Sequence, residues 1–366
     1  MLAVCASLLR GATHVVLTGR PANFEARHFP RPAPSPRRPP PQVRSRPFHP
    51  RTCARGPDEV DDAGDSALAL RSAAAHLRRF ARAHGCGPLR LYDGGSAPAA
   101  PVAHAEHVAE YLFGRADLAG GAVGAAVATA DYRGLLAELD GSADRRGALA
   151  AWLAADADDG ALEPLANVAE ATRGAASVDV LVGGPMTALN ALATSDPDFA
   201  GKIAHVRAMA AAWDCSTANL FANQFNCAAD LGAAAAALGP GGPLGAAPVT
   251  LYTTEFCKGA LSLSPAEVRA RAAPPVAALY DLWHDLTGGR GAVTLFDVAP
   301  LLDLVAPPLA PTVPVACALR SDGVFAITEV AESRVRATRR VLSAEDAAAA
   351  KGKLLDLLAN AALAAL

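Results

Sequence analysis

Short apolar runs that end in turn residues recur along this chain and predict buried strands. The run at residues 178–182 leads through a Gly-Gly-Pro turn into a helix from about Met186, and residues 248–256 form a second strand of this kind. Such runs are typical of strands that are covered on both faces. Strand and helix alternate over most of the chain, which predicts an α/β fold with a mostly parallel central sheet flanked by helices.

Two segments near the C-terminus extend this prediction. The runs VPVACAL and GVFAITEV, from Val313 and Gly323, flank an Arg-Ser-Asp-Gly turn, so we expect a β-hairpin there. The Ala- and Leu-rich tail predicts a helix with Ser343 as its N-cap and Asp346 in its first turn.

Polar residues follow two of the predicted strands. Ligands of open α/β sheets usually bind at the carboxyl ends of the strands. The Gly-Gly-Pro turn follows the first strand, and the polar residues Asn223, Gln224 and Asn226 follow another strand-like run. We therefore expect the functional site to lie between these two turns.

Residues 1–57 differ in composition from the rest of the chain. They are rich in Arg and Pro, and Glu25 is their only acidic residue. An Arg-rich, acid-poor leader fits an organelle transit peptide, and a nucleic-acid-binding arm is the alternative. We predict a disordered leader over residues 1–57, in which residues 14–19 are a short strand or part of a targeting signal, and a single α/β domain over residues 58–366. We expect an intracellular protein, cytoplasmic unless the leader directs it to an organelle.

Composition and motif spacing argue against several classes of protein. The chain is 52% hydrophobic and 19% charged, which allows a sizeable core, and its net charge of -3 argues against a bulk nucleic-acid binder. No apolar run is long enough to span a bilayer. The seven Cys form no CxxC pair, which indicates reduced thiols rather than disulfides or a zinc site. An NAD-binding Rossmann site is disfavoured because VLVGGPMTAL lacks the GxGxxG spacing.

Several segments, in the right order, resemble the inosine–uridine preferring nucleoside hydrolase family. VDVLVGGPMTALNAL is similar to the family's central motif, roughly LVATGPLTNIALAL, and NQFNCAADLGAAAAAL is similar to its AEFNIYADPEAA segment. PVTLYTTEFCKG resembles the family's PITLVPLDVT strand, and LFDVAPLLDLVAP resembles its MHDPLAVAYLIDP segment. The resemblance extends over about residues 63–340 and identifies the chain as a divergent member.

This resemblance implies a nucleoside-hydrolase fold and a hydrolase that cleaves the N-glycosidic bond of a ribonucleoside into base and ribose. In the family, a calcium ion held by oxygen ligands binds the ribose hydroxyls and the attacking water. The resemblance also implies a small-molecule nucleoside as partner, neither nucleic acid nor membrane, and a place in purine or pyrimidine salvage. It is compatible with a homo-oligomer.

The family's site residues carry over to five positions. Asp297 matches a calcium ligand, and Gly183 matches the residue that lends a backbone carbonyl to the metal. Asn226 matches the Asn that binds ribose hydroxyls, and Asn219 lies one place from another such Asn. Gln224 stands where the family has Glu, so it can bind a hydroxyl without the strength of a charged acceptor. The alternative is structural: the Asp caps a turn, and the amides bind nearby backbone.

A long helix before Asp297 supplies two further candidates. Tyr280 and His284 lie four residues apart and therefore on one helical face. The corresponding helix of the family carries aromatic side chains that reach the nucleobase. We predict that Tyr280 binds substrate and that His284 protonates the leaving base, since imidazole titrates near neutral pH. The alternative is a surface His beside Trp283.

The family's N-terminal DTDxGxDD loop has no counterpart in the sequence. HVVLTGRPANF lacks its carboxylates, and the acidic residues of 61–65 lack the strand that should precede them. Phe113 and Phe296 replace two His residues of the family motifs. Only Asp297 and one carbonyl remain for an ion that takes about six to eight oxygens. The sequence thus predicts either an active N-glycosidase or an inactive protein of the same fold that has lost its metal site.

Overall fold

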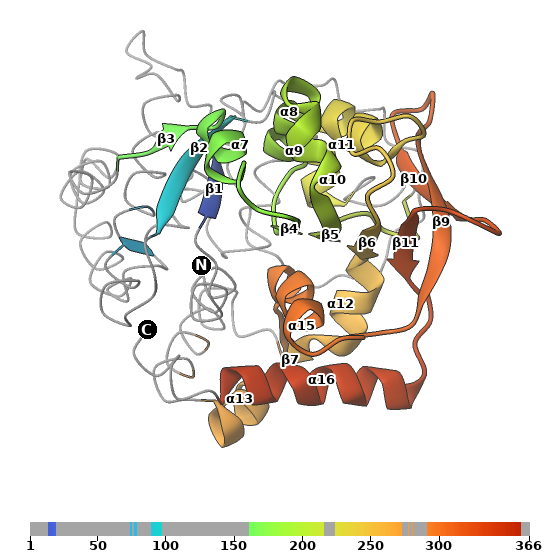
Figure 1. The fold of residues 1–366 in the computed structure, drawn as a ribbon. Helices are drawn as coiled ribbons and strands as arrows, with labels where there is room; N and C mark the ends of the chain where they lie inside the picture. The colour runs from blue at the N-terminus through green and yellow to red at the C-terminus, as the bar shows by residue number, and fades with distance from the viewer. Residues whose placement is uncertain are drawn as a thin grey trace, which may run out of the picture.

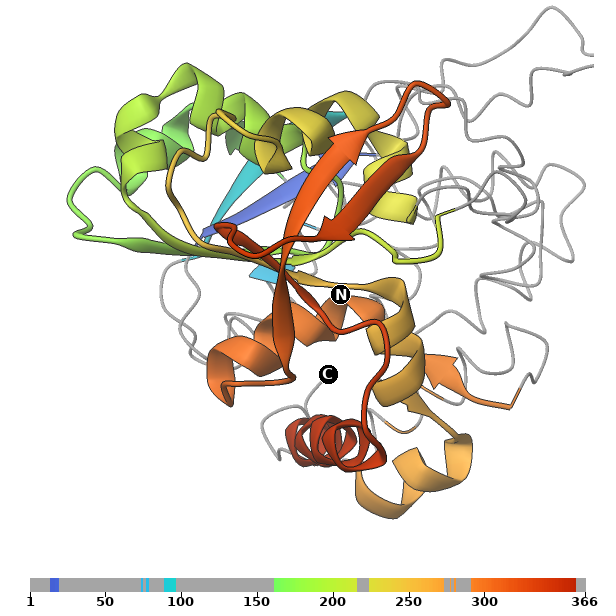
Figure 2. The ribbon, with the colours of Figure 1, turned by 90° about the vertical axis from the view of Figure 1, so that its right-hand side faces the viewer.

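A mixed β-sheet lies between two layers of helices in this computed structural model (Figures 1 and 2). The structure describes residues 14–19, 74, 77, 78, 89–96, 161–215, 224–272, 277, 280 and 291–359. In this part of the chain no helix is long and apolar enough to cross a membrane. The layered arrangement confirms the α/β fold that the alternating pattern predicted.

Six strands form the central sheet in the order β10-β9-β11-β6-β5-β4. Their bounds are β4 (Val178–Val182), β5 (Ile203–Met209), β6 (Val249–Tyr252), β9 (Thr312–Leu319), β10 (Phe325–Glu329) and β11 (Val335–Thr338). β4, β5, β6 and β11 pair in parallel, whereas β9 pairs antiparallel with both β11 and β10. The predicted strand at residues 178–182 and the predicted C-terminal hairpin are therefore confirmed. The predicted burial of that strand is wrong, because β4 is an edge strand of the described sheet and only its Val182 is buried.

Three more strands form a separate parallel sheet of order β1-β2-β3. They are β1 (His14–Gly19), β2 (Arg90–Ser96) and β3 (Glu163–Pro164), and a small antiparallel pair joins β7 (Ser262–Leu263) to β8 (Val293–Thr294). Residues 14–19 thus form a strand, which was one of the two predictions for this segment. The other residues of the predicted leader lie outside the described part, so the division of the chain at residue 57 stays a prediction.

The two helical layers cover opposite faces of the sheet (Figure 2). The upper layer holds α7 (Asn167–Ala171), α8 (Thr187–Ser195), α9 (Pro197–Gly201), α10 (Phe225–Ala229) and α11 (Leu231–Leu238). The lower layer holds α12 (Thr254–Ala260), α13 (Pro265–Arg271), the 3-10 helix η3 (Phe296–Val298), α15 (Ala299–Val305) and α16 (Ala344–Leu358). The Ser343 side chain accepts a hydrogen bond from the Asp346 amide, so the predicted N-cap of the tail helix is confirmed.

Alternate residues of the parallel strands enter two different cores, because successive side chains of a strand point to opposite faces. Val206 and Ala208 of β5 belong to the upper core, whereas Met209 belongs to the lower one. On the lower face β5 also carries His205 and Arg207, whose polar partners are Thr250 of β6 and residues of β4 and α15. The lower face of the sheet is therefore partly polar, unlike the upper face.

Candidate functional site

Asn226 joins the carboxyl ends of β4 and β5. Its Nδ2 atom donates hydrogen bonds to the Met209 carbonyl at 2.8 Å and to the Gly183 carbonyl at 3.2 Å. Met209 ends β5, and Gly183 follows the last residue of β4. The site that we expected between two strand-end turns is thus a single cluster at the carboxyl edge of the sheet, where α/β proteins usually bind ligands.

The side-chain amide of Asn226 has one defined orientation. Nδ2 faces two carbonyl oxygens, which can only accept, so the nitrogen and not the oxygen must lie there. Both N–H groups are then used, and no described residue donates to Oδ1. Asn226 is buried, so its position is fixed by the surrounding protein. Within the described residues, its Oδ1 is thus an acceptor without a donor.

Asp297 lies against Gly183. A Cβ atom at residue 183 would stand 3.3 Å from the Asp297 Cβ and 3.6 Å from its Cγ, so a methyl group there would make a tight contact with the Asp297 side chain. Glycine thus allows the close approach of η3 to the end of β4 without a shift of Asp297. Both residues are exposed to solvent. The structure brings together the three positions that the family motifs single out, and we call Gly183, Asn226 and Asp297 the acceptor site.

The Asp297 carboxylate is crowded by protein and yet accessible. Desolvation by the protein around it raises the pKa of Asp297 to about 6, because burial disfavours the charged form. Solvent nevertheless reaches the residue. An accessible carboxylate keeps part of its hydration, so at pH 7 we treat Asp297 as ionised and able to accept hydrogen bonds.

Gln224 and Tyr280 are occupied by local partners. Gln224 caps α10, since its Oε1 accepts from the Cys227 amide at 3.1 Å, and its Nε2 lies 3.1 Å from the Met209 sulfur. The Tyr280 hydroxyl accepts from the Val293 amide at 2.9 Å and lies 3.2 Å from the Val293 carbonyl. Both residues are buried. Their roles in substrate binding stay predictions.

Two further predicted site residues, Asn219 and His284, lie outside the described residues. Their placement beside the acceptor site therefore stays a prediction, as does the role of His284 as an acid.

The described residues do not by themselves fit a calcium ion. The ion needs about six to eight oxygens, and Gly183 and Asp297 supply one carbonyl and one carboxylate. Among the residues that the structure describes, no three or more His, Cys, Asp or Glu converge to hold a metal. The acidic residues of 61–65 lie outside the described residues, so calcium binding stays a prediction.

Two features of this edge lie in the backbone and could not be predicted from the sequence. The Met209 carbonyl holds Asn226, but a carbonyl leaves no signal in a sequence. Ala211, just beyond β5, has φ of 66°, and it is buried. L-residues other than Asn and Asp rarely adopt this conformation, and strain of this kind clusters at functional sites. No Gly or Asn in the segment MAAAW marked the turn.

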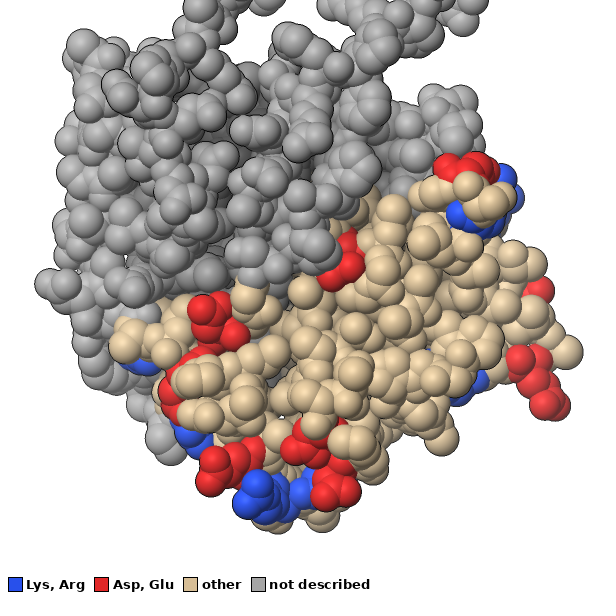
Figure 3. Space-filling model, turned by 90° about the horizontal axis from the view of Figure 1, so that it is seen from above, with Lys and Arg blue, Asp and Glu red and all other residues tan. Residues whose placement is uncertain are grey.

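Charge is dispersed over the face seen from above (Figure 3). Acidic and basic side chains stand at the borders of the described surface, and uncharged residues cover its centre. The described part of this face carries no broad basic field that would attract a polyanion.

Comparisons with known proteins identify the family. A purine-preferring ribonucleoside hydrolase from Gardnerella vaginalis is similar in structure, with a TM-score of 0.50 and 15% identity over 80% of this chain and 87% of that chain. The plant nucleoside hydrolase PpNRh1 has a TM-score of 0.50 and 15% identity over 82% of this chain and 96% of its own. The type III effector protein XopQ, solved with adenosine diphosphate ribose, has a TM-score of 0.52 and 13% identity over 99% of this chain and 90% of its own.

At these identities the structural matches show a shared fold. No curated protein matches the chain. The family model described as inosine-uridine preferring nucleoside hydrolase, however, matches residues 63–347, which is most of the sequence. The chain therefore belongs to the inosine-uridine preferring nucleoside hydrolase family of N-glycosyl hydrolases.

Proposed function

We propose that this protein binds a ribonucleoside at the acceptor site and hydrolyses its N-glycosidic bond to base and ribose. One observation carries the proposal. The Gly183 carbonyl, the Oδ1 of Asn226 and the Asp297 carboxylate all accept hydrogen bonds and donate none.

An acceptor-only site suits a ligand that presents hydroxyl groups. The vicinal hydroxyls of a ribose can donate to two or three acceptors at once, whereas a phosphate or carboxylate ligand would be repelled. Hydrogen bonds to a charged group such as Asp297 contribute about 1.5–3 kcal/mol each. One relative supports the choice of ligand, since it is named a purine-preferring ribonucleoside hydrolase.

The described residues would bind and orient the sugar. Asn226 is rigidly held and would fix one hydroxyl, and the Asp297 charge would stabilise the positive charge that develops on the sugar as the bond to the base breaks. In the family calcium supplies the activated water when it is bound. The residues described here supply only part of that metal's ligands, so the water-activating group stays unassigned.

Ribose release tests the proposal. Purified protein would be incubated with inosine, uridine, adenosine and cytidine, each with added calcium and with chelator. We expect ribose release from at least one nucleoside, and its loss in the Asp297→Asn variant. Release that persists unchanged in Asp297→Asn would contradict the role of the acceptor site.

A second function is favoured by a specific observation. Gln224 replaces the family's Glu and is spent on capping α10 and on the contact with Met209. Together with the missing acidic loop, this favours a protein that binds nucleosides without cleaving them. Calorimetric binding of inosine without ribose release in any condition would establish this second function.

A further inference from the structure

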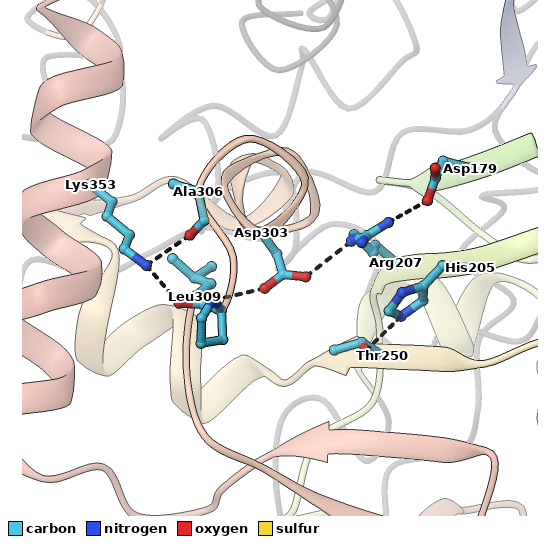
Figure 4. A network of polar contacts seen from close by, with 9 residues as sticks. Asp179, His205, Arg207, Thr250, Asp303, Ala306, Leu309 and Lys353 are labelled. Carbon is cyan, nitrogen blue, oxygen red and sulfur yellow. Dashed lines mark hydrogen bonds and ion pairs between the residues drawn. The ribbon is translucent and has the colours of Figure 1, made fainter.

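A buried ion-pair cluster lies on the lower face of the sheet (Figure 4). Arg207 of β5 donates from Nε to the Asp303 Oδ2 at 3.0 Å and from Nη1 to the Asp179 Oδ1 at 2.6 Å. The side chains of Arg207 and Asp303 are 12% and 14% exposed, whereas that of Asp179 is 46% exposed. We call these three residues the ion-pair cluster.

Each member of the ion-pair cluster lies on an element that leads to, or is hydrogen-bonded to, a residue of the acceptor site. Asp179 is in β4, whose end leads to Gly183. Arg207 is in β5, whose last residue, Met209, binds Asn226. Asp303 is in α15, which continues directly from the 3-10 helix that carries Asp297. One guanidinium thus cross-links the three elements on which the acceptors depend.

The segment that carries Asp297 has polar anchors at its two ends. The Leu295 amide donates to the Leu261 carbonyl at 3.1 Å, and Lys353 Nζ donates to the Ala306 carbonyl at 2.8 Å. Neither η3 nor α15 has a side-chain hydrogen bond at its N-cap. Helices this short are not stable by themselves, so packing and distant contacts must hold them. Asp303 uses both carboxylate oxygens for this purpose, because Oδ2 accepts from Arg207 and Oδ1 accepts from the Leu309 amide at 2.8 Å.

We infer that Arg207 is a positioning residue, which holds α15 against β4 and β5 and so sets the position of Asp297 relative to Gly183 and Asn226. Its importance for ligand binding rests on the proposed function, whereas its effect on the position of η3 does not.

A positioning role of Arg207 can be distinguished from a stabilising role, because buried ion pairs often contribute little net free energy to folding. The attraction between buried charges roughly offsets the cost of removing them from water, so replacing both partners often changes stability little. Such a pair instead selects one geometry, since any shift leaves buried charges unpaired. Removing both charges together should therefore loosen the placement of Asp297 more than it destabilises the fold.

The test is the double variant Arg207→Met with Asp303→Asn. The Asp303→Asn substitution keeps an acceptor for the Leu309 amide, and Asp179 is exposed enough to stay hydrated. Arg334→Met is the matched control, because Arg334 is also half-buried and donates to backbone carbonyls far from the site, those of Ala237 and Gly239. Amide hydrogen exchange over residues 293–302 and calorimetric binding of inosine are measured for each folded protein.

We expect exchange at the hydrogen-bonded amides of Leu295 and Ala299, which flank Asp297, to be about tenfold faster in the double variant, and inosine binding to weaken by about tenfold. The control should change neither quantity, and Arg207→Lys, which keeps a cation, should restore part of both. If the double variant does not fold, the same measurements on Arg207→Lys against wild type decide the matter.

Unchanged exchange at the amides of Leu295 and Ala299 in either folded variant would overturn the inference. Wild-type protein that fails to bind inosine would instead contradict the proposed function, and the exchange measurement would still decide whether Arg207 positions η3.

Discussion

The acceptor site and the ion-pair cluster are both polar, both join β4, β5 and the segment of η3 and α15, and yet they differ in how far their hydrogen bonds are satisfied. In the ion-pair cluster, Arg207 meets two carboxylates, and both oxygens of Asp303 are engaged. In the acceptor site, Asn226 Oδ1 has no donor in the described part of the chain, and Asp297 and Gly183 are open to solvent.

This difference indicates which cluster serves a ligand. Buried polar groups normally have hydrogen-bond partners, so a cluster whose groups are all paired within the protein has a structural role and needs no ligand. Acceptors at the carboxyl edge that face solvent, or that no described residue fills, can instead take a donor from outside the protein. The same elements thus carry a structural device on one side and a binding surface on the other.

The largest expected effect comes from breaking the ion-pair cluster on one side only. Arg207→Met leaves Asp303 buried without its cation and should destabilise the fold by about 3–5 kcal/mol in urea unfolding. The control Arg340→Met removes the exposed ion pair with Asp214 and should cost about 0–1 kcal/mol. If the two substitutions lowered the free energy of unfolding equally, the ion-pair cluster would stabilise the fold no more than an exposed ion pair does.

A substitution in the acceptor site should weaken ligand binding and leave stability unchanged. Asp297→Asn should weaken inosine binding by about 10- to 100-fold, which corresponds to the loss of charged hydrogen bonds of about 1.5–3 kcal/mol. It should not lower stability at pH 7, because the protein around Asp297 raises the pKa of that carboxyl and thus disfavours its charge. Asp198→Asn, an exposed residue of α9, serves as the control and should bind inosine as wild type does.

A smaller effect concerns the strained turn after β5. Ala211→Gly should leave stability nearly unchanged in urea unfolding, because relief of the left-handed conformation offsets both the entropy that glycine adds to the unfolded chain and the loss of a buried methyl group. The same substitution at Ala236, exposed within α11, should destabilise by about 1 kcal/mol. A loss of stability at Ala211 larger than that at Ala236 would show that the turn is not strained.

The smallest effect is a dependence of stability on pH beside the ion-pair cluster. Burial, and then the charge of Arg207, lower the pKa of His205, whose Nε2 lies 2.9 Å from the Thr250 hydroxyl. The unfolded chain therefore binds a proton more readily, so this contribution is complete above the ordinary His pKa of about 6.5 and is lost as pH falls through the lower folded value.

His205→Gln keeps a hydrogen-bonding group and removes the titration. The melting temperature of wild type should fall more between pH 7 and pH 5 than that of the variant. Identical pH dependence in the two proteins would contradict this assignment.

Much of this architecture could be predicted from local pattern. The apolar run of β4, the hairpin of β9 and β10 and the N-cap Ser343 follow from side-chain periodicity and turn chemistry, which act over a few residues. The resemblance to the family also singled out Gly183, Asn226 and Asp297 as residue types. These residues could be predicted because a sugar site needs a small turn residue and oxygen acceptors, and such residue types can be recognised at single positions of a sequence.

Only the tertiary structure decided how these residues are used. Gln224 and Asn226 are both amides two positions apart, yet one is consumed as a helix cap while the other keeps an acceptor that no described residue fills. Arg207 and Asp303 carry no local signal of their pairing, because it depends on where α15 crosses β5. Hydrogen bonds between distant segments are set by the path and register of the whole chain, and it is these bonds that separate a saturated cluster from one that can receive a ligand.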